Sequence, residues 1–171
     1  LLIFSKKSLL GKALVLLVLF PSLISDYFII TNPLYAPIPY ADKGQYIDNW
    51  PSGWGIKEVN MYLANKAIDG KLYVFTEGTF GLLPYGIEIY LVDNPNVVIS
   101  GIWPLPEAFP AQIRRAAESY PTYFILNQSQ QVPLNWPLEL ISEYQKGNRE
   151  DRKLRFYRVI SAPVSLTSVI R

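Results

Sequence analysis

A hydrophobic segment near the start of the chain limits what it can fold into more than any other feature. The stretch from Ala13 to Ser25 carries no charge, and Lys6, Lys7 and Lys12 precede it. A helix that spans a bilayer needs about 20 apolar residues. Leu9 to Tyr27 comes close to that length if Lys12 extends its amine to the lipid headgroups. We therefore expect a transmembrane helix here, with its basic flank in the cytoplasm.

Two other interpretations of residues 1–30 remain open. Basic residues before a short apolar core are also typical of a secretory signal peptide, although Leu23-Ile24-Ser25 is a poor cleavage site. A buried core helix is the third possibility, but the segment is apolar on all faces. Positive charge stays on the cytoplasmic side of a membrane. Both membrane interpretations place the rest of the chain outside, so we expect a protein integral to the cell membrane with its main domain on the extracytoplasmic side.

The composition excludes several kinds of chemistry. The 171 residues contain no histidine and no cysteine, which excludes a Ser/His/Asp triad, a cysteine nucleophile, a structural zinc site and a disulfide framework. We expect no metal site. The net charge of +2 is too small for a typical nucleic-acid-binding protein, and we expect no nucleic-acid partner.

The segment 31–55 is rich in proline, glycine and aromatic residues and separates the apolar segment from the rest. Its prolines favour extended and turn geometry, so we expect an ordered linker without a long helix or a central strand. An extracytoplasmic domain is expected over residues 56–160, and a tail over residues 161–171.

Within 56–160, runs with helical periodicity alternate with short β-rich runs. We expect helices over Ile56–Ala67, Pro84–Leu91, Pro110–Tyr120 and Pro137–Lys146, and strands over Lys71–Thr76, Asn96–Trp103, Thr122–Asn127 and Leu154–Ile160, the last at an edge of the sheet. Strands that alternate with helices favour a parallel sheet with right-handed crossovers. The expected fold class is therefore α/β, with an N-terminal transmembrane helix followed by a small Rossmann-like three-layer domain. Its sheet would be mostly parallel, with about four strands.

Candidate ligand-binding residues follow from this fold, because ligands of open α/β sheets lie beyond the carboxyl ends of the strands. Two glycines between the first strand and the next helix can present backbone amides to a ligand, or can simply form a tight turn. The candidates are Glu77, Gly78, Thr79 and Gly81 from this loop and Asn127 from the loop after the third strand. A neutral, hydroxyl-rich ligand suits the loop better than an anion, because Glu77 repels negative charge.

A second candidate is the tryptophan-rich turn before the first helix of the domain, in the loop on the membrane side. Tryptophan is common at membrane interfaces, so the turn could bind a lipid headgroup or a phosphate; a buried aromatic anchor is the other interpretation. The membrane-side loop contributes Asp42, Gln45, Tyr46, Trp50, Ser52, Gly53 and Trp54. Its acidic residues have no spacing that marks an acid/base pair. No residue of the chain is predicted to be catalytic.

Three runs of residues resemble the carboxyl-terminal part of bacterial membrane glycosyltransferases of the protein-O-mannosyltransferase-like superfamily, which depend on dolichyl- or polyprenyl-phosphate-mannose. They are ADKGQYIDNWPSGWGIKEV, VFTEGTFGLLPYGIEIYL and ISGIWPL, and the resemblance covers roughly residues 9–160. Its most specific pieces are Asp42-x-x-Gln45-Tyr46, Trp50-Pro51-Ser52-Gly53 with Gly55, and Glu77-Gly78-x-x-Gly81-x-x-Pro84.

The resemblance implies a multi-span parent enzyme that moves a sugar from a polyprenyl-phosphate carrier to an acceptor outside the membrane. Its catalytic acidic residue is implied to lie in the first outer loop, in an N-terminal part that is missing here. We therefore expect the last span and outer domain of such an enzyme, without catalytic residues or a cofactor of its own. Its partners would be membrane lipid and the missing N-terminal transmembrane part, and a polyprenyl-phosphate-linked sugar would be the parent's donor. The alternative is a membrane-anchored extracytoplasmic binding module for a small polar ligand.

Overall fold

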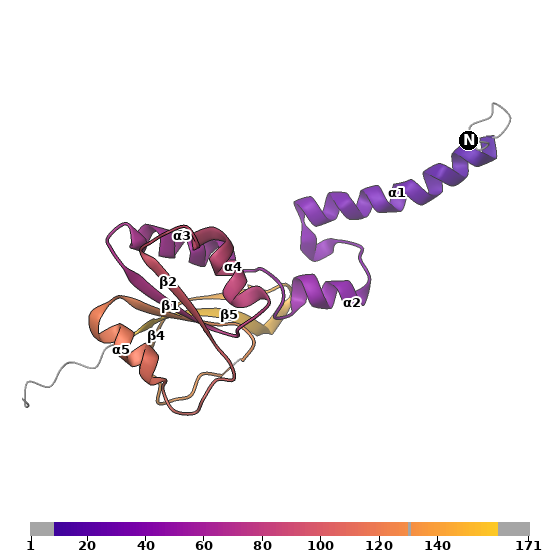
Figure 1. Cartoon of the computed structure of the whole chain (residues 1–171). Helices are drawn as coiled ribbons and strands as arrows, with labels where there is room; N and C mark the ends of the chain where they lie inside the picture. The colour runs from indigo at the N-terminus through magenta and orange to yellow at the C-terminus, as the bar shows by residue number, and fades with distance from the viewer. Residues whose placement is uncertain (1–8, 130, 161–171) are drawn as a thin grey trace, which may run out of the picture.

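A computed structural model describes residues 9–129 and 131–160 of the chain. An N-terminal helix stands apart from an α/β domain, and a short helical linker connects the two (Figure 1). The basic flank with Lys6 and Lys7 and the expected tail at residues 161–171 lie outside the described residues.

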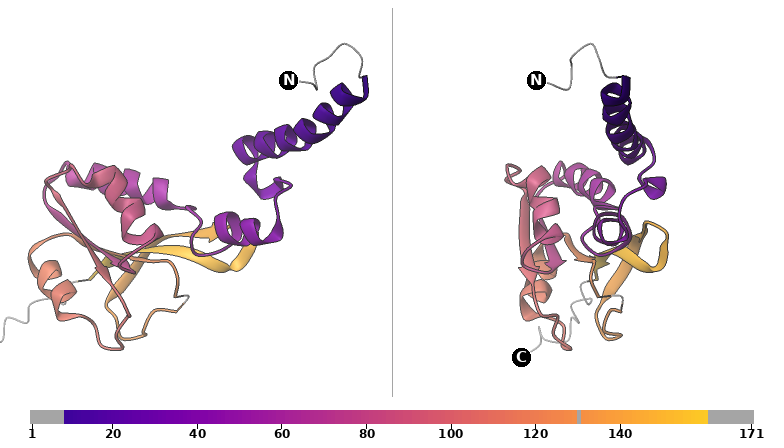
Figure 2. Two further views of the ribbon diagram at one scale, coloured as in Figure 1. Left: turned by 45° about the vertical axis from the view of Figure 1, so that its right-hand side comes forward. Right: turned by 90° about the vertical axis from the view of Figure 1, so that its right-hand side faces the viewer.

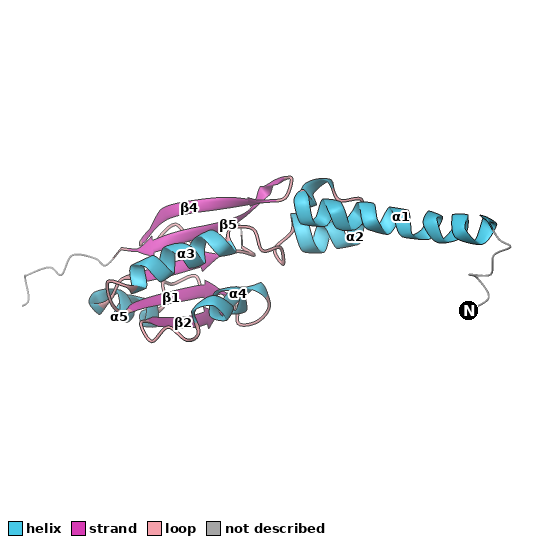
Figure 3. Ribbon diagram, turned by 90° about the horizontal axis from the view of Figure 1, so that it is seen from above, coloured by secondary structure: helices cyan, strands magenta, loops and turns pink. Residues whose placement is uncertain are grey.

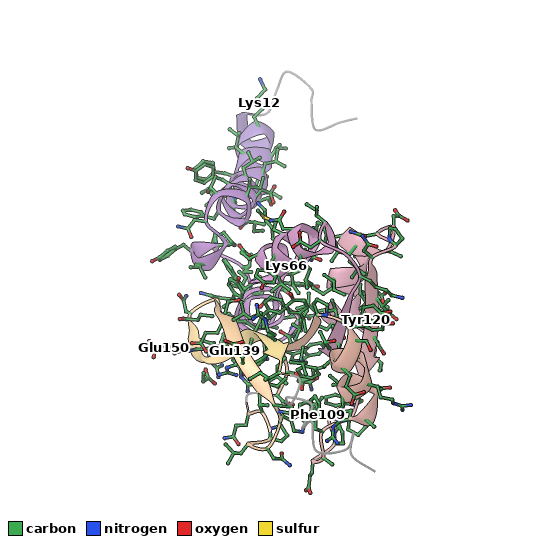
Figure 4. All side chains as sticks on the ribbon, turned by 90° about the vertical axis from the view of Figure 1, so that its left-hand side faces the viewer. Lys12, Lys66, Phe109, Tyr120, Glu139 and Glu150 are labelled. Carbon is green, nitrogen blue, oxygen red and sulfur yellow. The ribbon has the colours of Figure 1, made fainter. Side chains whose placement is uncertain are left out.

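Helix α1 (Leu9–Thr31) carries the apolar segment and has Pro21 inside it. Most of its large apolar side chains from Leu14 onward are exposed; Leu17, for example, is 71% and Ile30 81% exposed. Among the described residues, α1 is the one helix long and apolar enough to cross a membrane, a test that a signal sequence also meets. Residues 11–31 of this helix would span roughly 30 Å, the thickness of a hydrocarbon core. Figure 4 shows Lys12 at the far end of this helix, away from the folded domain.

The linker consists of short helical turns. A 3₁₀ turn, η2 (Pro33–Tyr35), is followed by α2 (Tyr40–Lys43) and directly by a π-helical turn, η3 (Gly44–Asp48). Two hydrogen bonds fold this segment back on itself and onto α1. The Ser25 hydroxyl donates to the carbonyl of Pro37 at 3.3 Å, and the Lys43 amine donates to the carbonyl of Leu34 at 3.2 Å.

The domain contains one five-stranded sheet with the strand order β2-β1-β3-β5-β4. The strands are β1 (Leu72–Glu77), β2 (Val97–Ile102), β3 (Thr122–Leu126), β4 (Leu138–Lys146) and β5 (Arg149–Val159). Strand β1 pairs in parallel with β2 and β3, whereas β5 pairs antiparallel with both β3 and β4. The first three strands confirm the expected ones to within two residues. The sheet is mixed, however, so the mostly parallel sheet was a wrong expectation, and the Rossmann-like arrangement is not confirmed.

Two expectations for the end of the domain are wrong. The helix expected over Pro137–Lys146 is strand β4, and β5 is an interior strand while β2 and β4 form the edges. From Ser142 to Lys146, more exposed and less exposed side chains alternate, as in a strand. The turn at residues 147–148 joins the two strands as a hairpin, and the ladder with β5 outweighs the weak helical preference of this segment.

Three helices cover the two faces of the sheet and give the expected three layers. Helices α3 (Ile56–Ala67) and α4 (Leu82–Leu91) pack on one face, and α5 (Ala111–Ser119) packs on the other. On the first face, Leu63 of α3 and Ile87 of α4 lie fully buried against Phe156 of β5 and its neighbours. On the second face, Ile113 of α5 packs in a cluster with Phe124 of β3 and with Trp136 from the loop between β3 and β4.

Candidate functional site

The carboxyl edge of the three parallel strands faces the linker and α1 (Figure 3). Every candidate residue from the strand-end loops lies at this edge, and the Trp50 end of the linker packs onto it. The structure therefore brings together two sets of candidates that are separated by more than 20 residues in the sequence. Their contacts decide what the edge can do.

Glu77, the last residue of β1, is 3% exposed, and its carboxylate binds the loop that follows β3. The backbone N–H groups of Asn127, Gln128 and Ser129 donate to its oxygens at 2.8, 2.6 and 2.7 Å. The hydroxyl of Ser129 also donates to Oε1. These donors satisfy a buried carboxylate that would otherwise destabilise the fold by several kcal/mol. Glu77 therefore connects two strand-end loops, which fits the structural interpretation of this turn; its role in binding a ligand stays a prediction.

The glycines of the first loop allow its backbone to approach β2 and Trp50. The N–H of Gly78 donates to the carbonyl of Ile102 at 2.9 Å, and a Cβ on Gly101 would overlap the carbonyl oxygen of Gly78. Gly78 and Gly81 have φ values of 102° and 86°, which glycine adopts without strain. A Cβ on Gly81 would lie 3.5 Å from the indole ring of Trp50, at ordinary van der Waals distance.

Trp50 is the point where the linker meets the sheet. Its carbonyl accepts a hydrogen bond from Asn127 Nδ2 at 2.8 Å and a longer one, at 3.5 Å, from the amine of Lys146. The same amine donates to the carbonyl of Ser52 at 2.7 Å. Ser52 is buried, and its hydroxyl donates to the carbonyl of Asn49. These bonds fix residues 49–52 between β3 and β4.

Lys146 is fully buried, which is rare for a lysine. Two backbone carbonyls solvate its amine, and within the described part of the chain no carboxylate forms an ion pair with it. Burial lowers the pKa of Lys146 to about 8. Sequence analysis did not mark this residue, because it was placed at the end of an expected helix and its burial depends on the hairpin.

The other candidates from the membrane-side loop are spread around the same junction. Trp54 is half-buried and donates from Nε1 to the carbonyl of Ile47 at 2.8 Å. In contrast, the side chains of Asp42, Gln45 and Tyr46 are exposed, as is Gly53. Gly55 has a φ of 84°, and a Cβ there would lie 2.6 Å from the ring of Tyr144.

The turn between β4 and β5 lies against η3 (Figure 2). The N–H of Asn148 donates to Oδ1 of Asp48 at 3.2 Å, and a Cβ on Gly147 would overlap that carboxylate. Between this turn and the linker lies an open cavity of about 510 Å³. Its lining comes from both sides: Tyr40, Ala41, Gly44, Gln45, Asp48, Asn49, Trp50 and Pro51 from the linker, and Arg149 from β5.

A second cavity, of about 530 Å³, lies at the opposite, amino edge of the sheet. Lys66, Asp69, Tyr120 and Arg158 are among its lining residues, and Figure 4 shows Lys66 and Tyr120 on the folded domain, far from Lys12. No candidate residue from the sequence lies there.

Among residues 9–129 and 131–160, no group of three acidic side chains is placed to hold a metal ion. The candidate site therefore consists of hydrogen-bonding and aromatic groups at the carboxyl edge. Comparisons with protein-family models, with curated proteins and with solved structures give no match to the chain.

Proposed function

We propose that this chain is the last span and outer domain of a membrane glycosyltransferase of the protein-O-mannosyltransferase-like superfamily, and that the outer domain presents the carboxyl edge of its sheet to the membrane. One observation carries the proposal. The sequence pieces that resemble this superfamily are spread from residue 42 to residue 84, yet they meet at one edge of the domain. A Cβ on Gly81 would lie 3.5 Å from the ring of Trp50, and Trp54 is hydrogen-bonded to Ile47 next to the first piece.

The position of this edge relative to α1 supports the same proposal. The bond from Ser25 to Pro37 ties the linker to the end of the apolar helix, and Figure 3 shows α1 and α2 beyond the carboxyl ends of β1 and β2. If α1 spans the bilayer, the carboxyl edge is the part of the domain nearest to the headgroups. A polyprenyl-phosphate-linked sugar has its polar group at that depth.

We assign the domain a role in covering the active site and receiving the acceptor, with the chemistry in the N-terminal part of the parent. This division agrees with the contacts of Glu77, whose carboxylate oxygens accept hydrogen bonds from a neighbouring loop. We therefore expect residues 1–171 alone to transfer no sugar. The alternative, a membrane-anchored binding module for a small polar ligand, is favoured by the cavity between the linker and β5.

The proposal is tested by sugar transfer in membranes that contain the full-length parent. Labelled hexose on a polyprenyl-phosphate carrier is the donor, and transfer is compared for the wild type, Asn127→Ala and Glu118→Gln. Asn127→Ala removes the bond to Trp50, worth about 1 kcal/mol, and should reduce transfer by loosening the linker. Glu118 is exposed on α5, so its variant should behave like the wild type. No transfer by the wild-type parent, or transfer by residues 1–171 alone, would contradict the proposal.

Sidedness is tested separately with reporter fusions after Lys12 and after Tyr62. We expect the Tyr62 junction to be extracytoplasmic, because positive charge precedes the span. Activity of a cytoplasm-only reporter at that junction would refute this orientation.

A further inference from the structure

The cavity between the linker and β5 has the lining of a saccharide site. It is about 510 Å³ in volume, which falls within the range of small-molecule sites. Two aromatic residues, Tyr40 and Trp50, line it. Aromatic rings offer flat apolar surfaces, and the C–H faces of a pyranose ring can pack on such surfaces.

The polar groups of the lining are of the kind that binds hydroxyls. Gln45 and Asn49 carry side-chain amides, which both donate and accept, and Asp48 carries a carboxylate, which accepts. The Gln45 side chain is exposed, so a ligand can reach it. A sugar hydroxyl both donates and accepts, so this mixture can satisfy several hydroxyls of one ring.

The charges of the cavity argue against an anionic ligand. Its one lining cation, Arg149, donates from Nε and Nη2 to the two carboxylate oxygens of Asp151, each at 2.8 Å. The hydrogen bond and the charge of that carboxylate raise the pKa of Arg149, and the charge of Asp48 acts on it in the same direction. Asp151, which also lies 3.5 Å from Nε of Arg152, offsets part of the guanidinium charge, and the carboxylate of Asp48 would repel a phosphate. A neutral, hydroxyl-rich ring suits the lining better.

We propose that this cavity binds the ring of a neutral saccharide, with Tyr40 and Trp50 against its C–H faces and Gln45 and Asp48 on its hydroxyls. The ring could belong to the lipid-linked donor or to a glycan acceptor. Only the lipid-linked source rests on the proposed function. The carbonyl of Trp50 accepts hydrogen bonds from Asn127 and Lys146, so a ligand in the cavity would touch the residue that anchors the linker to the sheet.

The experiment measures binding to the full chain in lipid nanodiscs by saturation-transfer NMR. The probes are the methyl glycosides of glucose, mannose, galactose and N-acetylglucosamine, with inorganic phosphate as the anionic probe. We expect millimolar binding of at least one glycoside and no binding of phosphate. Tyr40→Ala and Gln45→Ala should each weaken glycoside binding at least fivefold. Tyr40 is 91% exposed and can be truncated without loss of a core contact, and Tyr90→Ala, on a 65% exposed tyrosine of α4, is the matched control.

Absence of glycoside binding, binding of phosphate instead, or an equal loss in Tyr90→Ala would overturn the proposal. A second arm compares nanodiscs that contain polyprenyl-phosphate-hexose with nanodiscs that contain polyprenyl phosphate alone. If the lipid-linked hexose displaces the glycoside, the donor is the source of the ring. If a soluble oligosaccharide displaces the glycoside and the lipid-linked hexose does not, the acceptor is the source. If glycoside binding depends on Tyr40 but the parent transfers no sugar, the saccharide site is supported and the proposed transferase function is refuted. If the parent transfers sugar but binds no glycoside, the transferase function is supported and the saccharide site is refuted.

Discussion

Glu77→Gln tests how the carboxyl edge is held together. In the native structure Oε2 accepts the N–H groups of Asn127 and Gln128, and Oε1 accepts the N–H and the hydroxyl of Ser129. Glutamine can keep its carbonyl oxygen at the Oε2 position and turn its amide nitrogen toward the hydroxyl of Ser129, which can rotate to accept. The N–H of Ser129 then loses its acceptor at the Oε1 position and keeps only the bond to Oε2 at 2.9 Å. The variant therefore removes both the charge and one acceptor.

The magnitude follows from the three backbone amides. A hydrogen bond to a charged group contributes about 1.5 to 3 kcal/mol, and one between neutral groups about 0.5 to 1.5 kcal/mol. A loss of about 1 kcal/mol for each of three bonds gives a destabilisation of about 3 kcal/mol. For a domain of about 105 residues each kcal/mol lowers the Tm by about 4 °C, so we expect a decrease of about 12 °C.

The assay is thermal unfolding of the full chain in detergent, followed by near-ultraviolet circular dichroism of the domain's aromatic residues. Hydrogen exchange at Asn127, Gln128 and Ser129 reports on the amides directly and should become faster in Glu77→Gln. Glu118→Gln makes the same chemical change on an exposed side chain and should leave both measurements unchanged. An unchanged Tm with unchanged exchange in Glu77→Gln would refute the assigned role of this carboxylate.

Three further predictions concern the junction of linker and hairpin. The folded pKa of Lys146, about 8, lies below its ordinary value of 10.5, so the unfolded chain binds more protons between these values. Stability should therefore rise with pH across this window by up to about 3 kcal/mol, and urea unfolding of Lys146→Met should lack this rise. Gly55→Ala should lower the free energy of unfolding by more than about 2 kcal/mol in the same assay, because the φ of Gly55 is positive and an added Cβ would overlap Tyr144. Gly53→Ala is the control: no atom lies within 4 Å of its added Cβ, so stability should change by less than about 1 kcal/mol. Gly147→Ala should also destabilise the domain by about 2 kcal/mol or more, because its added Cβ would overlap the carboxylate of Asp48 in η3. A variant as stable as the wild type would contradict the contact between the hairpin and η3.

Local patterns predicted the first part of the domain well. The stripe that begins at Ile56 and ends at Ala67 has the same bounds as α3, because one helix face packs against the sheet. The strand that ends near Asn127 is fully buried along its length, and its continuous apolar run was a reliable signal. These elements depend on side chains within one segment, which the sequence displays directly.

The hairpin and the site around it depend on contacts between distant segments, which local patterns do not display. The segment that ends at Lys146 has a weak local preference, and only pairing with β5 makes it a strand. The burial of the Lys146 amine follows from that pairing and from carbonyls about 95 residues earlier in the chain. Likewise, the position of Glu77 beside Ser129 was predictable from the parallel sheet, but its hydrogen bonds were not.

The orientation of the domain on the membrane is the central claim, and it is tested most directly by the depth of spin labels in nanodiscs. The 171 residues contain no cysteine, so Thr79→Cys and Glu118→Cys each provide a single labelling site in this chain. Both positions are exposed; residue 79 lies at the carboxyl edge and residue 118 near the amino edge. The two edges are about one strand length, roughly 20 Å, apart. We expect the nitroxide at residue 79 at headgroup depth and the nitroxide at residue 118 in water, so that a nickel chelate reaches residue 118 more readily than residue 79. Equal exposure of both labels to water, or a label at residue 118 closer to the bilayer, would contradict this orientation.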